Sequence, residues 1–160
     1  MSSSKKLFEK LIEKLIIDPY FDIYTRNGLE YILERNNLDN DLVIFLIDFN
    51  NLKALNNRLG YKKVNELFKE LFSVLKHEFI IGRAFSGDEV FLCTENYMLN
   101  IDNIKQVCLE YNLEFKSIWG IYNPHYGKLS TFLDKLIEQL HYNDGNIINN
   151  LFKNSKYQLN

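Results

Sequence analysis

Three carboxylate side chains occupy two points of the sequence where the chain is expected to turn after a strand. Asp48 follows an apolar run of strand length, and Asp88 and Glu89 lie between two shorter apolar runs. Carboxylate oxygens are the ligands that Mg²⁺ prefers, and the ion usually shares them with substrate phosphates. Two ions held in this way activate an attacking hydroxyl and stabilise a leaving pyrophosphate. The alternative is a solvated hairpin turn, in which acidic residues are common.

Apolar periodicity predicts a single sheet that brings the two acidic points together. The run from Leu42 to Ile47 is apolar at every position, as in a strand buried on both faces, and Asp48 ends it. Two short strands, 79–82 and 90–93, are expected to form a hairpin. The remaining spacing predicts helices over 7–15, 28–34, 62–75, 101–111 and 129–142 and a strand over 113–122.

The predicted order from residue 42 onward is β-α-β-β-α-β, which is the order of ferredoxin-like folds. We therefore expect an α+β fold with a ferredoxin-like or palm βαββαβ core and a mainly antiparallel sheet, covered by helices on at least one face. In such a sheet the first strand and the hairpin are neighbours. The three carboxylates are therefore expected to converge at one edge of the sheet.

Composition narrows the class of protein. A chain of 160 residues with 46% hydrophobic and 14% aromatic residues can fill the core of one domain without disulfides. The formal net charge of −2 gives no basic footprint, so no nucleic-acid partner is expected. Cys93 and Cys108 are interpreted as buried thiols in a reducing compartment. His77, His125 and His141 lack the spacing of a zinc site.

The N-terminal residues 1–17 are expected to form an amphipathic helix rather than a secretory signal, because charges interrupt the apolar residues at every third or fourth position. No apolar run approaches the roughly 18 residues that a membrane-spanning helix needs. We therefore expect a cytoplasmic protein without a membrane partner. Packing on the domain is the expected role of this helix, and pairing with another chain is the alternative.

Three segments in order resemble the motifs of the GGDEF family of nucleotide cyclases. Residues 18–26 align with the opening motif D-x-L-T-G-L-x-N-R and keep Asp18, Ile23 and Arg26. Residues 47–57 resemble the central motif I-D-x-D/N-x-F/L-K-x-x-N-D, and residues 86–90, Ser-Gly-Asp-Glu-Val, stand where G-G-D-E-F would be. The resemblance covers most of the chain and implies one GGDEF-like domain over residues 18–155.

The resemblance implies a role for each matching residue. Two Mg²⁺ or Mn²⁺ ions would be held by a set that includes the three candidate catalytic carboxylates: Asp48, Asp88, Glu89 and the carbonyl of Phe49. The triphosphate would be bound by Lys53, by backbone amides at Phe49, Asn50, Asn51 and Leu52, and at Gly87, where a side chain would obstruct the phosphates. The base would be read by Asn56 and Asn65.

The chain also departs from the family pattern. Asn65 stands where guanine-specific cyclases have an Asp, and an Asn amide offers both a donor and an acceptor, as adenine does. ATP is therefore at least as plausible a substrate as GTP. Aligned without gaps, His141 and Gly145 replace the Lys and Arg with which the family grips the γ-phosphate. No R-x-x-D precedes Ser86, so product inhibition by that route is not expected.

The activity implied is a metal-dependent nucleotidyltransferase that condenses nucleoside triphosphates, ATP or GTP, into a cyclic di- or oligonucleotide second messenger. Cyclisation in this family needs two facing sites, so a homodimer, stable or transient, is implied. A diguanylate cyclase and a divergent enzyme similar to the minimal CRISPR polymerases, palm domains associated with antiviral signalling, are both compatible with the motifs. A catalytically silent nucleotide-binding domain and an unrelated α+β interaction module are the alternatives.

Overall fold

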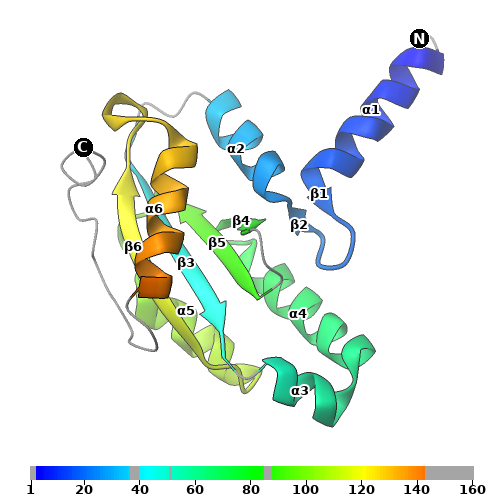
Figure 1. The fold of residues 1–160 in the computed structure, drawn as a ribbon, viewed down its shortest axis with the longest axis vertical. Coiled ribbons are helices and arrows are strands. Elements are labelled where there is room, and N and C mark those ends of the chain that lie inside the picture. The colour runs from blue at the N-terminus through cyan, green and yellow to red at the C-terminus, as the bar shows by residue number, and fades with distance from the viewer. Residues whose placement is uncertain (1–2, 37–39, 51, 85–87, 143–160) are drawn as a thin grey trace.

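The computed structural model describes residues 3–36, 40–50, 52–84 and 88–142, without the side chains of residues 13–15 and 126. Figure 1 shows the elements along the chain. They are α1 (Ser3–Ile16), β1 (Ile17–Asp18), β2 (Ile23–Tyr24), α2 (Arg26–Arg35), β3 (Leu42–Phe49), α3 (Leu52–Leu59), α4 (Tyr61–Leu75), β4 (Ile80–Arg83), β5 (Glu89–Thr94), α5 (Ile101–Glu110), β6 (Phe115–Tyr122), the 3₁₀ turn η1 (Pro124–Tyr126) and α6 (Leu129–Tyr142).

A six-stranded sheet organises these elements in the order β1-β2-β4-β5-β3-β6. All neighbouring strands are antiparallel except β2 and β4, which pair in parallel at Tyr24 and Gly82. The α+β class and the βαββαβ core from β3 to β6 are confirmed. The sequence did not predict β1, β2 or α3.

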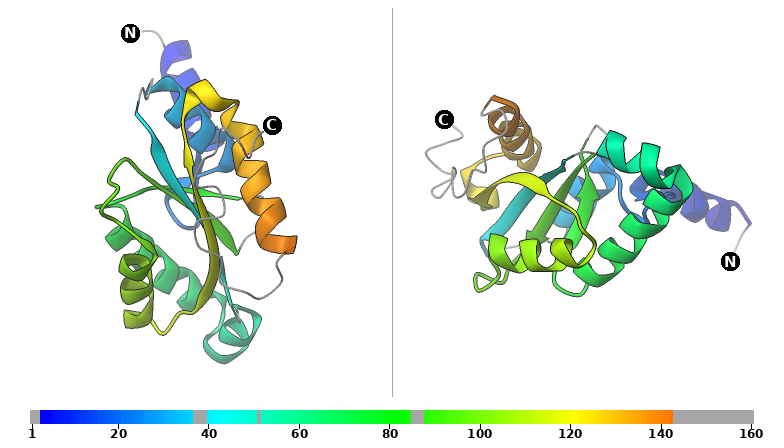
Figure 2. Two further views of the ribbon diagram at one scale, coloured as in Figure 1. Left: turned by 90° about the vertical axis from the view of Figure 1, so that its left-hand side faces the viewer. Right: turned by 90° about the horizontal axis from the view of Figure 1, so that it is seen from below.

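Helices cover both faces of the sheet, as Figure 2 shows with the sheet between α6 on one side and α4 and α5 on the other. Alternate residues of β3 explain this arrangement. Val43, Phe45 and Ile47 belong to the core beneath α4 and α5. Ile44 and Leu46 belong to a second core, together with residues of α2 and α6. A strand buried on both faces reads as a continuous apolar run, which is why β3 was predictable.

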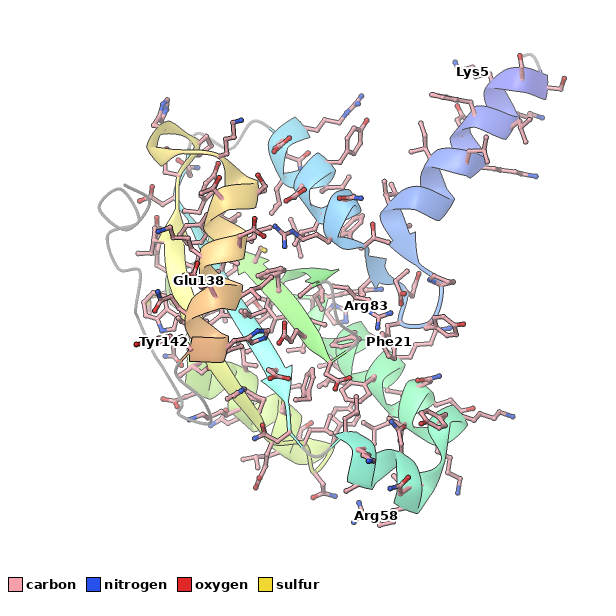
Figure 3. All side chains as sticks on the ribbon, viewed as in Figure 1. Lys5, Phe21, Arg58, Arg83, Glu138 and Tyr142 are labelled. Atoms are coloured by element: carbon pink, nitrogen blue, oxygen red, sulfur yellow. The ribbon has the colours of Figure 1, made fainter. Side chains whose placement is uncertain are left out.

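The opening segment is held by partly buried ion pairs. The Asp18 carboxylate accepts a hydrogen bond from the Arg83 guanidinium at 2.8 Å and another from the backbone N–H of Phe21 at 2.9 Å. Figure 3 shows Arg83 beside Phe21, and its guanidinium lies 5.0 Å from the ring centroid. Arg26 is only 6% exposed and donates to Asp134 of α6 at 2.9 Å. Asp18 and Arg26, the two charged residues that match the opening motif of the family, therefore form ion pairs that stabilise the fold.

The helix α1 lies at the margin of the fold and projects away from the body of the protein (Figure 1). Leu7, Phe8 and Leu11 are 60%, 63% and 49% exposed. The expectation that this helix simply packs on the domain is therefore wrong for its first turns. None of the described helices combines the length and hydropathy needed to span a bilayer.

Candidate functional site

The sheet places Asp48 and Glu89 directly opposite each other on neighbouring strands. Asp48 of β3 is the register partner of Glu89 of β5. Glu89 opens β5 and does not lie in the hairpin turn, where the sequence had placed it. Residues directly opposite in an antiparallel pair have Cβ atoms about 4.5–5.5 Å apart on one face of the sheet. The two candidate metal carboxylates therefore converge, on the face that α6 covers.

Negative charge is concentrated at this point of the sheet. The side chains of Asp48 and Glu89 are 20% and 6% exposed. Burial first, and then repulsion from Glu89, raises the pKa of Asp48; Asp88 adds to the rise, while Lys116 and His141 oppose it. Ionising this carboxyl in the folded protein is therefore less favourable than in water.

A lysine and a histidine side chain flank the carboxylate pair. Lys116 of β6 is the register partner of Asp48 on the other side, and its Nζ lies 3.6 Å from Asp48 Oδ2. His141, in the last turn of α6, contacts Glu89 through its Nε2. The sequence alignment had placed His141 at a phosphate-gripping position, and the structure brings it to the carboxylates. Lys116 was not predicted, because its importance follows only from the pairing of β3 with β6.

The segment after Asp48 is tied into the sheet. The backbone N–H of Phe49 donates to the carbonyl of Asp88 at 3.2 Å, and that of Asn50 donates to the carbonyl of Glu114 at 2.9 Å. The predicted amide cradle therefore does not extend to these two N–H groups in this conformation. Asp88, which directly precedes β5, is exposed. Leu52, the first residue of α3, remains a candidate for phosphate binding.

The candidate base-reading residues lie on two helices that pack together. Asn56 belongs to α3 and Asn65 to α4, and both are half-buried. The side-chain oxygen Oδ1 of Asn56 is buried and has no hydrogen-bond partner among the described residues. A buried acceptor without a partner is costly, so it favours a ligand that donates to it. Lys53, the predicted phosphate ligand, is exposed on α3.

Some predicted positions lie outside the described residues, namely Asn51, Ser86, Gly87 and Gly145. Within the described part of the chain, no group of three or more His, Cys, Asp or Glu residues forms a ready metal site. The described donors are two carboxylates, Asp48 and Glu89, whose mutual repulsion a hard divalent cation would relieve. That donor set fits Mg²⁺ or Mn²⁺ shared with substrate phosphates better than a metal enclosed by protein alone.

The structure has the fold of GGDEF domains. It is similar to a microbial GGDEF domain studied with bis-(3′,5′)-cyclic di-GMP, at a TM-score of 0.63 and 17% identity over 88% of this chain and 99% of that one. It is also similar to the coiled coil and GGDEF domain of DgcB from Caulobacter crescentus in complex with c-di-GMP, at a TM-score of 0.65 and 10% identity over 91% and 90% of the two chains. A third similar structure is the diguanylate cyclase SiaD of Pseudomonas aeruginosa in complex with its activator SiaC, with a TM-score of 0.60, 16% identity and coverage of 91% and 65%.

These likenesses are structural, and identities of 10–17% show the fold alone. No model of a known protein family matches the sequence, and no curated protein sequence matches it. The resemblance in three short motifs and the shared fold agree with each other. Together they define a divergent GGDEF-like domain.

Proposed function

We propose that this chain is a metal-dependent nucleotidyltransferase that condenses nucleoside triphosphates into a cyclic di- or oligonucleotide. The observation that supports this most is the pair formed by Asp48 and Glu89, side by side in register on β3 and β5 of a GGDEF-like sheet. Partial burial and the charge of Glu89 raise the pKa of Asp48, so this carboxylate opposes folding at neutral pH, and a bound cation would offset that cost.

In this proposal Asp48 and Glu89, assisted by Asp88 and the carbonyl of Phe49, would hold Mg²⁺ or Mn²⁺ at the end of the sheet. The ions would supply neutralisation of phosphate charge and activation of the attacking 3′-hydroxyl. Lys53 meets the triphosphate as a flexible point charge. The 3′-oxygen of one nucleotide attacks the α-phosphorus of another, the bond to the β-phosphate oxygen breaks, and pyrophosphate leaves. The protein contributes mainly positioning and electrostatic stabilisation.

Base choice in this proposal depends on Asn56 and Asn65. The buried oxygen of Asn56 can accept from an exocyclic amine, which both adenine and guanine carry on their edges. Asn65 can donate as well as accept, so it does not impose the acceptor-only chemistry that favours guanine. We therefore propose that the enzyme accepts ATP as well as GTP.

Cyclisation requires that two nucleotide sites face each other, which a second copy of the chain would provide. The exposed apolar side chains of α1 give the protein a surface with which such a pairing is compatible. A homodimer that forms transiently around substrate is sufficient for this chemistry.

The test is product formation. Purified protein is incubated with Mg²⁺ or Mn²⁺ and each nucleoside triphosphate, singly and in pairs, and products are identified by mass spectrometry. A cyclic product that is absent with Asp48→Ala and present with Asp102→Ala, an exposed acid of α5, is the expected result. The proposal would be overturned if Asp48→Ala formed as much cyclic product as wild type. It would also be overturned if both variants formed the product and were only slower.

A second candidate is a silent domain that binds nucleotide and relays a signal. It is favoured by Lys116 and His141, whose side-chain nitrogens already lie against the carboxylates of Asp48 and Glu89. Nucleotide binding without any product under all of these conditions would select it.

A further inference from the structure

Glu89, Asp48 and Lys116 form one row across three neighbouring strands. Asp48 is in register with Glu89 of β5 on one side and with Lys116 of β6 on the other. Residues directly opposite in antiparallel strands point to the same face. The sheet therefore places the Lys116 side chain beside the two carboxylates of the candidate metal site, on the face that α6 covers.

The environment of Lys116 is unusual for a structural lysine. Its side chain is only 18% exposed, and lysine is rarely buried without a close partner. The ammonium lies 3.6 Å from Asp48 Oδ2, which is an ion-pair distance but too long for a hydrogen bond. Buried ion pairs compensate their desolvation only when good hydrogen-bond geometry accompanies them. Within the described residues, this pair lacks that geometry.

Lys116 also borders a pocket at the β6 edge of the sheet. The pocket has a volume of about 380 Å³ and is lined by Asn50, a predicted phosphate-binding residue, and by Lys105 and Leu109 of α5. The flexible four-carbon stem and three rotatable donors of Lys116 allow it to turn from one anion to another. A divalent cation bound to Asp48 would take over the neutralisation of that carboxylate, and the ammonium would then be attracted to the nearest remaining anion.

We propose that Lys116 binds the terminal phosphates of the nucleotide, and that it exchanges Asp48 for these phosphates when metal and nucleotide bind together. This rests on the proposed function of the Asp48–Glu89 site and adds a positioning residue to it. The contact is a charge-assisted hydrogen bond from Nζ to a phosphate oxygen, of the kind that lysine forms readily. It would supply a lysine cation to a sequence that has His141 and Gly145 at the aligned positions where the family has Lys and Arg.

The experiment compares nucleotides that differ only in phosphate number. Affinities of wild type for a non-hydrolysable ATP analogue, ADP and AMP, and for the guanosine series, are measured by calorimetry in Mn²⁺. The same titrations are made with Lys116→Met, which keeps the apolar stem, and with Lys116→Arg, which keeps the charge. Lys128→Met is the matched control for net charge, since Lys128 precedes α6 at the end opposite to His141. Mn²⁺ affinity without nucleotide is measured for each protein as well.

Lys116→Met is expected to weaken triphosphate binding by about tenfold or more, with monophosphate affinity nearly unchanged. Its Mn²⁺ affinity without nucleotide should be equal or higher, because a competing cation has been removed. Lys116→Arg should retain part of the preference for triphosphate, and Lys128→Met all of it. A preference that stays the same in Lys116→Met overturns the role of Lys116 while leaving the site itself intact. Absence of triphosphate binding in wild type overturns the proposed function, and this inference with it.

Discussion

Replacing Asp48 by Asn should make the metal-free protein more stable. The partly buried Asp48 carboxylate faces Glu89 across the β3–β5 ladder, and desolvation and this repulsion are the largest influences on its raised pKa. Attraction from Lys116 ranks below both. The isosteric amide removes the charge while leaving the volume unchanged, so the net effect on the free energy of unfolding is expected to be positive.

The size of the effect follows from comparable substitutions. Removing an unfavourable charge typically stabilises a protein by about 0.5–2 kcal/mol. In a chain of this length, 1 kcal/mol corresponds to about 2–4 °C in Tm. We therefore expect Asp48→Asn to raise Tm by a few degrees in buffer with a chelator.

The pH dependence of stability tests the sign of this change in the free energy of unfolding independently. A carboxyl group whose pKa is higher in the folded than in the unfolded protein binds its proton more tightly when folded, so protonation stabilises the fold. Wild type should therefore gain stability relative to Asp48→Asn as pH falls. The extra free energy of unfolding of Asp48→Asn relative to wild type should be largest above the raised pKa of Asp48. It should disappear below the ordinary pKa of 3.8.

The assay is thermal unfolding followed by circular dichroism at several pH values, with Asp102→Asn as the control. Asp102 is an exposed acid in the first turn of α5, where its negative charge interacts favourably with the helix dipole. Removing that charge should therefore lower the free energy of unfolding by less than about 1 kcal/mol. A lower Tm for Asp48→Asn at pH 7, or an advantage that grows as pH falls, would refute this reasoning.

Three further predictions concern base choice, packing and thiol chemistry. Asn65→Asp should shift nucleotide preference toward guanosine, measured as the ratio of GTP to ATP affinities; an unchanged ratio would remove Asn65 from the base site. Gly28→Ala should destabilise the fold by about 1–3 kcal/mol in chemical denaturation, because an added Cβ would lie 2.1 Å from the carbonyl oxygen of Ile16, and a neutral result would contradict that close approach. Burial raises the pKa of the Cys108 thiol to about 12, so this thiol should react with alkylating reagents at pH 8 only after unfolding; rapid modification of the native protein would count against it.

The core of the fold was predictable because its signals are strong and local. The uninterrupted apolar run of β3 and the helical spacing in α4 and α6 each point to one element. The strands β1 and β2 have two residues each, too few for any periodicity to show. The helix α3 buries no residue completely, although Leu52, Leu55 and Leu59 are spaced as on one helical face and could have revealed it.

The candidate site was only partly predictable. Asp48 and Glu89 were identified from motif spacing, and their proximity follows from the sheet order. Lys116 lies in a strand whose sequence gives no hint of its partner, because cross-strand neighbours depend on register. The exposure of α1 was also hidden, since an amphipathic helix has the same pattern whether its apolar face meets its own domain or another surface.

The measurement that tests the central claim most directly is Mn²⁺ binding followed by electron paramagnetic resonance, with and without a non-hydrolysable nucleoside triphosphate. The wild-type protein is expected to bind Mn²⁺ together with the nucleotide, and Asp48→Asn is expected to lose this binding although it is the more stable protein. Asp102→Asn should bind as wild type does. Equal Mn²⁺ binding by wild type and Asp48→Asn would contradict the assignment of the Asp48–Glu89 pair as the metal site.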